Sequence, residues 1–251
     1  MPGKTLICAT ASAALLLSPA LASASDADDL TARQLATQAK DNLLAAGSVR
    51  LGFTDRSPGV NDSRTRPAAM DVAMDRDGNC AGTMTMAAKG GGVEIVKRGK
   101  QVWMKPDTAF WKAQLPGGQG DRAAELFKNR YIHGSTDDTL LKGMADICDL
   151  SRFQKDAGTG TSGGTTLTKG KETTRDGTRV VPLHGTTEDG RRTTLHVTAD
   201  APHRLVAATR KDKDTDVTLS FSDYGKPVPT RTPPANETVD IGKLEEQLLG
   251  G

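Results

Sequence analysis

The chain has 251 residues, of which 33 are Lys or Arg and 31 are Asp or Glu. This length allows one large domain or two small ones, and no change in composition marks a boundary, so we expect a single domain. The balanced, scattered charge gives no electrostatic support for nucleic-acid binding. Aromatic residues make up only 4% of the chain, so a core must come mainly from Leu, Val, Ala and Met.

Residues 1–24 have the pattern of a secretory signal peptide. Lys4 precedes an apolar run over residues 6–17, and small residues then suit cleavage after Ala22 or Ala24. The run is too short to span a membrane, and no stop-transfer segment follows it. Cys8 lies at the start of the run, whereas a lipobox cysteine lies at its end. The sequence therefore predicts an exported, soluble protein of the cell envelope or exterior, without a lipid anchor, whose mature domain is residues 25–251.

Removal of the signal peptide would leave two cysteines, Cys80 and Cys148. Exported proteins fold in an oxidising compartment, and two cysteines allow only one intramolecular pairing. We therefore expect a disulfide bond between them. Two unpaired, buried thiols are the alternative.

The first element of the mature chain is an amphipathic helix between Asp28 and Ala46. Its apolar residues recur at helical spacing, Asp28 or Asp29 is the expected N-cap, and Gly47 is the expected stop. Both signs of charge occur on the polar face, which favours packing on a core over lying on a membrane surface.

Short strands follow this helix. A strand over residues 48–54 and a polar loop over 55–67 precede two hairpins, which turn at Asp77-Gly78 and at Gly99-Lys100. All six methionines other than Met1 fall between residues 70 and 144. Methionine-rich faces adapt to irregular apolar ligands, although methionine also fills ordinary cores.

The middle of the chain is predicted to be helical. Short helices are expected within residues 106–115 and 121–128, and a third is expected to be capped by Ser135 with Asp138. The third helix carries Cys148 on its apolar face. Because Cys80 is in phase with the methionines of the second strand block, a disulfide would attach this helix to the apolar face of the sheet.

A Gly/Thr-rich internal loop over residues 156–165 leads into a β-meander over residues 165–224. The clearest strand has Val217, Leu219 and Phe221 on one face, with strict alternation of apolar and polar residues. Past residue 224 we expect an extended, proline-rich segment and a final amphipathic turn or helix over residues 241–249.

Two strings match catalytic motifs but lack the required context. Residues 158–163 fit G-x-G-x-x-G and residues 160–164 fit G-x-S-x-G, yet both lie in the Gly/Thr-rich loop rather than between a strand and a helix. The four histidines have no metal-ligand spacing, and His184 and His196 fall on the polar sides of strands. We expect no enzyme activity, no cofactor and no metal site.

Five segments together resemble a known family: residues 78–82 (GNCAG), 97–106 (KRGKQVWMKP), 110–112 (FWK), 148–150 (CDL) and 221–225 (FSDYG). With the order of elements, they resemble the actinobacterial LppX/LprG-type lipoproteins and, more remotely, the LolA/LolB lipoprotein carriers. The resemblance implies an α+β fold in which a strongly curved antiparallel sheet forms a half-barrel. Helices would cross its concave face and enclose an apolar cavity for lipid or acylated cargo. The missing lipobox departs from the family.

We therefore predict a monomeric, non-enzymatic protein that binds a lipid, another hydrophobic ligand or an acylated partner. The alternative is a structural or protein-interaction module of the cell envelope, with a filled core. The side chains expected to line the cavity are Met70, Val72, Met74, Met84, Met86, Val93, Ile95, Leu140, Met144, Leu195, Val197, Val217, Leu219 and Phe221.

Overall fold

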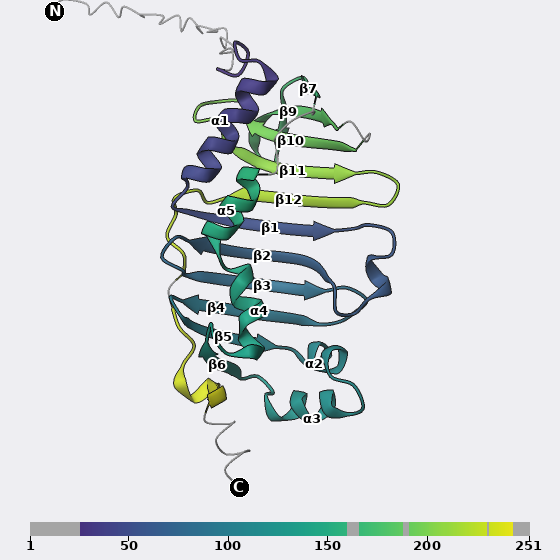
Figure 1. The fold of residues 1–251 in the computed structure, drawn as a ribbon, viewed down its shortest axis with the longest axis vertical. Helices are drawn as coiled ribbons and strands as arrows, with labels where there is room; N and C mark the ends of the chain where they lie inside the picture. The colour runs from purple at the N-terminus through teal and green to yellow at the C-terminus, as the bar shows by residue number, and fades with distance from the viewer. Residues whose placement is uncertain (1–25, 160–165, 188–190, 230, 243–251) are drawn as a thin grey trace, which may run out of the picture.

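The computed structural model of the chain describes residues 26–159, 166–187, 191–229 and 231–242. These residues form one continuous sheet of 13 strands together with five α-helices (Figure 1). The predicted signal peptide and residues 243–249 of the predicted final helix lie outside the described residues. Within the described part of the chain, no helix is long and apolar enough to cross a membrane.

The sheet is built from strands that mostly follow one another in hairpins. The strands are β1 (Ser48–Asp55), β2 (Pro67–Asp75), β3 (Cys80–Met86), β4 (Gly92–Arg98), β5 (Gln101–Pro106), β6 (Tyr131–Ser135), β7 (Thr166–Lys169), β8 (Thr173–Arg175), β9 (Thr178–Thr186), β10 (Arg192–Thr198), β11 (Leu205–Lys211), β12 (Asp216–Ser222) and β13 (Thr238–Asp240). Their order is β13-β6-β5-β4-β3-β2-β1-β12-β11-β10-β9-β7, and β8 also pairs with β9. Neighbours are antiparallel except for β13 and β6, which are parallel.

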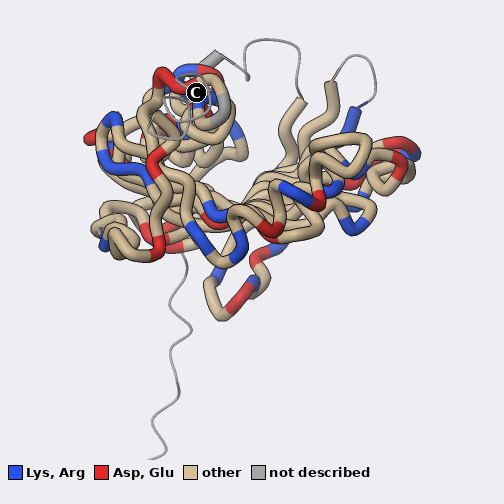
Figure 2. Tube along the Cα trace, turned by 90° about the horizontal axis from the view of Figure 1, so that it is seen from below, with Lys and Arg blue, Asp and Glu red and all other residues tan. Residues whose placement is uncertain are grey.

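The helices lie on one face of the curved sheet. They are α1 (Ala32–Ala45), α2 (Thr108–Gln114), α3 (Gln119–Leu126), α4 (Thr139–Ile147) and α5 (Leu150–Thr159). α1, α5 and α4 follow one another across the strands, while α2 and α3 lie beside the far end of the sheet (Figure 1). The tube view along the long axis shows helical turns gathered on one side of the sheet, and both signs of charge interspersed along the loops (Figure 2).

Two predicted helix starts are wrong by one turn. α1 begins after Thr31, whose hydroxyl accepts a hydrogen bond from the Gln34 backbone N–H while the Gln34 side chain accepts from the Thr31 backbone N–H. This reciprocal capping box satisfies two backbone donors, so Thr31 replaces Asp28 or Asp29 as the N-cap. Likewise α4 has Asp138 as its N-cap, because Ser135 is the last residue of β6.

The predicted loop over residues 156–165 is also wrong in its first part, because α5 continues to Thr159. Leu150, Phe153 and Ala157 share one face of α5 and pack on the core. That apolar face outweighs the low helix propensity of Gly158 at the end of the helix. Residues 160–165 lie outside the described residues.

Candidate functional site

The register places the predicted strand residues on one face of the sheet. Directly paired residues of antiparallel strands point to the same side, and Met70 pairs with Met84 while Met74 pairs with Cys80. The same face continues through β1 into β12, where Phe53 pairs with Leu219. The helices cover this face, because the ring of Phe153 on α5 packs against the ring of Phe221 on β12.

Under the helices this face is a packed core. Val72 is 1% exposed, Met74 0% and Ile95 4%. The ring centroids of Phe153 on α5 and Phe221 on β12 are 6.0 Å apart. These side chains are closed off by helix residues, so this part of the face has the burial of an ordinary domain interior.

Beside the helices the same face is partly open. Five apolar side chains pair step by step across neighbouring strands and are each only partly buried; we call them the apolar row. The apolar row consists of Leu195 on β10, Ala208 on β11, Leu219 on β12, Phe53 on β1 and Met70 on β2. Adjacent strands lie about 4.8 Å apart, so the four steps of the row span about 19 Å. In Figure 1, α5 crosses one half of β12 and β1 and leaves the half toward the β11–β12 turn uncovered.

At its β2 end the apolar row continues into buried side chains. Met70 is followed by Met84, which is 5% exposed, and then by Val93, which is 3% exposed. These residues belong to the same core cluster as Phe110 and Trp111 of α2. The predicted set of methionines is therefore divided between a packed part and an open part.

Two surface pockets lie outside the space between the sheet and α4 or α5. One of about 340 Å³ is on the opposite, outer face of the sheet, where Arg50, Asp71 and Thr85 line it. Another of about 510 Å³ lies at the ends of β3 to β5, and its lining includes Met84 and Val93 of the predicted cavity together with Pro106 and Lys128. Neither lies between the sheet and α4 or α5, where the cavity is predicted, so that cavity stays a prediction.

The structure describes the side chain of only one of the two helix residues that were predicted to line the cavity. Met144 of α4 is partly buried and packs against the core, while the side chain of Leu140 is outside the described part of the structure. Sequence reasoning did not include Phe53 or Ala208 in the site. Phe53 had a signal, since it alternates with polar residues in the strand predicted over residues 48–54, whereas Ala208 had none.

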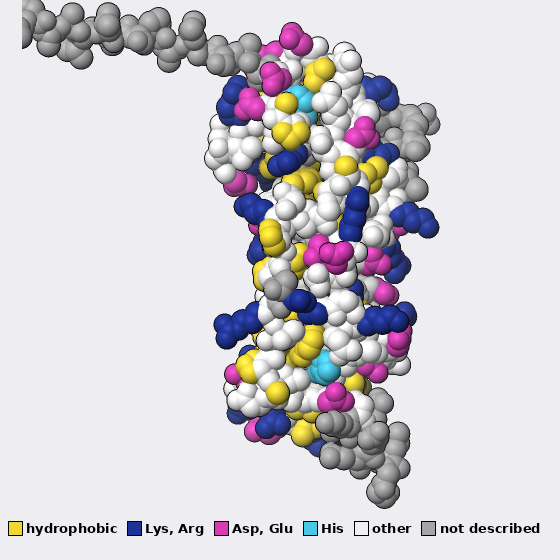
Figure 3. Space-filling view, turned by 90° about the vertical axis from the view of Figure 1, so that its left-hand side faces the viewer, with side chains coloured by type: hydrophobic (Ala, Val, Ile, Leu, Met, Phe, Trp, Pro, Cys, Tyr) yellow, Lys and Arg dark blue, Asp and Glu magenta, His cyan; other side chains and the backbone are white. Residues whose placement is uncertain are grey.

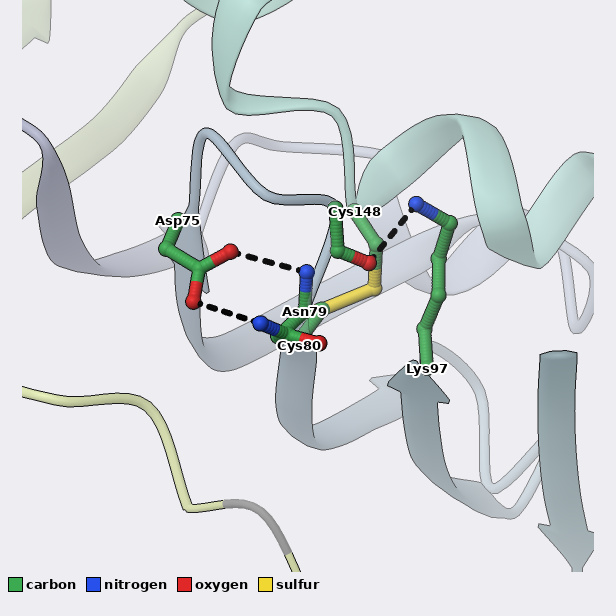
Figure 4. The surroundings of a disulfide bond; sticks show 6 residues. Asp75, Asn79, Cys80, Lys97 and Cys148 are labelled. Carbon is green, nitrogen blue, oxygen red and sulfur yellow. Dashed lines mark hydrogen bonds between the residues drawn. A yellow bond between two sulfur atoms is a disulfide. The ribbon is translucent and has the colours of Figure 1, made fainter. Parts of the chain in front are cut away.

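The disulfide between Cys80 and Cys148 is present, which confirms the predicted pairing. The sulfur atoms are 2.10 Å apart and the Cα atoms 5.6 Å apart. Beside it, the Asp75 carboxylate accepts hydrogen bonds from the Asn79 backbone and side chain, at 2.8 and 3.0 Å (Figure 4). Lys97 donates to the Gly78 carbonyl at 3.0 Å. The end of α4 is thus tied to the first residue of β3, next to a turn held by its own side chains.

A second connection joins α5 to α1. The buried side-chain amide of Gln154 donates to the carbonyl of Leu43 at 2.8 Å and to that of Ala46 at 2.9 Å. These carbonyls are at the end of α1, where helix geometry leaves them without partners inside the helix. α1, α5 and α4 are therefore each connected to another helix or to the sheet.

Among the described residues, no group of three or more His, Cys, Asp or Glu side chains could hold a metal ion. His184 pairs with Thr194, and His196 with Pro182, on the outer face of the sheet. Burial lowers the pKa of His196, with nearby Arg175 and His184 acting in the same direction.

Along the edge shown in Figure 3, hydrophobic side chains occur in small groups between charged ones.

Comparison with known proteins identifies the fold. No family model and no curated protein sequence matches the chain. The crystal structure of LprF from Mycobacterium bovis aligns over 81% of this chain and 97% of its own, with 17% sequence identity and a TM-score of 0.53. This chain has the fold of LprF. The predicted fold class is therefore confirmed, and the sheet of this LprF-type fold is open rather than closed.

Two further structures show weaker similarity. The lipoprotein LppX of Mycobacterium tuberculosis aligns over 80% of this chain and 98% of its own, with 16% identity and a TM-score of 0.49. A LolA superfamily protein from Nitrosomonas europaea aligns over 82% and 96%, with 14% identity and a TM-score of 0.24.

Proposed function

We propose that this chain is an exported, non-enzymatic protein that binds a lipid or another acylated molecule on the concave face of its sheet. The observation that carries the proposal is the apolar row, in which apolar side chains of five neighbouring strands are only partly buried. Contiguous apolar surface of this kind in a soluble protein marks a ligand or partner site more often than chance. The sequence resemblance to LppX/LprG-type lipoproteins implies cargo of the same class, and the LprF-type fold agrees with it.

We place the ligand along the apolar row rather than under the helices, because the side chains under the helices are already packed. The hydrocarbon core of a bilayer is about 30 Å thick and holds two layers of chains, so one acyl chain needs about 15 Å. The row, at about 19 Å, accommodates one such chain. Phe153 and Phe221 close the site on its helix side.

Binding of a fluorescent acyl probe tests this placement. Met70→Trp adds volume to the apolar row, and we expect it to reduce probe binding at least about tenfold, with little loss of stability, because Met70 is only partly buried. Thr85→Trp is the matched control. Thr85 pairs with Ala69, the neighbour of Met70 in β2, and therefore faces the outer side.

Each possible result separates the candidate functions. Loss of probe binding in the Thr85 variant but not in the Met70 variant would place the ligand on the outer face. A wild-type protein that binds no acyl probe would support the structural or protein-interaction module, which the packed core under the helices also favours. Native mass spectrometry of protein purified from its producing cells would show whether a lipid is retained.

A further inference from the structure

Arg210 of β11 borders the apolar row. It pairs with Val217 on β12 and with Thr193 on β10, and it lies two residues beyond Ala208 on the same strand. Arg210 therefore points to the same face as the row, one step toward the β11–β12 turn. A guanidinium group thus stands at the margin of an apolar surface, and its side chain is 43% exposed.

The hydrogen-bonding capacity of Arg210 is not fully used within the protein. Its Nε is buried and has no hydrogen-bond partner among the residues that the structure describes. The carboxylate of Asp212 is 3.7 Å from that atom, which is beyond hydrogen-bond distance. Asp212 already accepts a hydrogen bond from the Asp214 backbone N–H at 2.9 Å. This bond is the main reason that the pKa of Asp212 lies below its ordinary value, with Arg210 a minor contributor.

A second carboxylate on the same face, that of Asp55, forms an ion pair with a cation other than Arg210. Asp55 pairs with Val217 on the side away from Arg210. Its side chain is 3% exposed and lies 2.8 Å from the guanidinium of Arg66, and it also accepts from the Ser57 backbone N–H at 2.9 Å. The charge of Asp55 is therefore satisfied by Arg66 and Ser57.

We propose that Arg210 forms a subsite for an anionic head group at the margin of the apolar row, so that the cargo is an amphiphile with one acyl chain and a carboxylate or phosphate. Arginine suits this role because its planar group donates parallel hydrogen bonds to either anion. This inference rests on the proposed function and narrows its ligand class.

The test compares head groups on a constant chain. A neutral fluorescent acyl probe is displaced from the full mature protein by palmitate, by its neutral alcohol hexadecanol, and by lysophosphatidate. We expect at least one anion to displace the probe at about tenfold lower concentration than hexadecanol, because a charge-assisted hydrogen bond to Arg210 would strengthen its binding by about that factor. Whichever of palmitate and lysophosphatidate binds more tightly identifies the head group as carboxylate or phosphate.

Arg210→Gln should remove the preference for anions and leave the affinity for hexadecanol unchanged. The matched control is Arg192→Gln, which removes an exposed arginine from the neighbouring strand on the opposite face, since Arg192 precedes inward-facing Thr193. An anion preference that survives Arg210→Gln, or that is lost equally in the control, overturns the inference while leaving the proposed function intact. A wild-type protein that binds none of the amphiphiles overturns both. Melting temperatures of the variants confirm that each is folded.

Discussion

Met70 and Met84 face each other across β2 and β3, yet their surroundings differ. Met84 is 5% exposed within the core cluster, whereas Met70 is only partly buried. We expect Met84→Trp to lower the free energy of unfolding by about 1–3 kcal/mol, because a larger ring must displace packed neighbours. Urea unfolding of wild type and variant measures the difference. An unchanged stability would mean that empty space lies beside Met84, as the predicted cavity requires.

Asp55 should make stability depend on pH in the acid range. Burial acts to raise the pKa of its carboxyl group, but hydrogen bonds from Ser57 and the charge of Arg66 outweigh burial and hold it below the ordinary value. A folded-state pKa below the unfolded one stabilises the protein at neutral pH, and that contribution is lost as pH falls through the folded-state pKa.

We therefore expect Asp55→Asn to destabilise the protein at pH 7 and to cost less at pH 3, where the wild-type carboxyl group is also becoming protonated. Denaturant unfolding at both pH values measures this. Asp62→Asn, an exposed acid of the same connection, is the control and should have little effect at either pH. A penalty for Asp55→Asn that is equal at both pH values would show that the shape of the side chain matters and its charge does not.

At the scale of elements, the helices along the concave face are held by long-range connections. The disulfide joins residues 68 apart in sequence and ties α4 to β3, while Gln154 ties α5 to the end of α1. These connections set which part of the sheet the helices cover. They therefore also set where the apolar row is left open.

Replacing both Cys80 and Cys148 by Ala should lower the free energy of unfolding by roughly 4 kcal/mol, since the unfolded chain regains the freedom of a closed loop of this length. Thermal unfolding of the double variant, beside wild type with and without reductant, measures the loss. Reduced wild type and the double variant should melt together. A double variant as stable as oxidised wild type would show that helix packing alone holds α4 in place.

At the scale of the whole molecule, one core runs along the sheet. Buried residues from α1 at one end to α3 at the other belong to a single hydrophobic cluster, in keeping with the single domain that we propose for the mature chain. The helices cover one face of that sheet, and the strands carry mainly polar side chains on the other face. A ligand of the class that we propose would therefore meet apolar side chains at the margin of the covered face.

If the chain is exported as we propose, its mature form should begin at Ser23 or Ser25 and carry no lipid, because Cys8 would leave with the predicted signal peptide. The intact mass of protein recovered from outside the cytoplasm measures both features. A mass that includes a diacylglyceryl group, or a chain that retains Cys8, would contradict the predicted signal peptide.

The sequence by itself determined most of the strands of this protein and the face to which their apolar residues point, although β6 and β13 were not predicted. Alternation along a strand is local, so Met70, Val72 and Met74 could be assigned to one side before any partner strand was known. The disulfide was also determined locally, because only Cys80 and Cys148 would remain after cleavage of the signal peptide.

Only the tertiary structure decided which part of that face is covered. The α5 helix is stabilised because Leu150 and Phe153 pack on the sheet. Periodicity along the sequence could not reveal this helix, because the segment ends in glycine and threonine. The parallel pairing of β13 with β6 joins residues more than a hundred positions apart. Whether Met70 is open and Met84 closed depends on where such distant segments come to lie, and no local pattern carries that information.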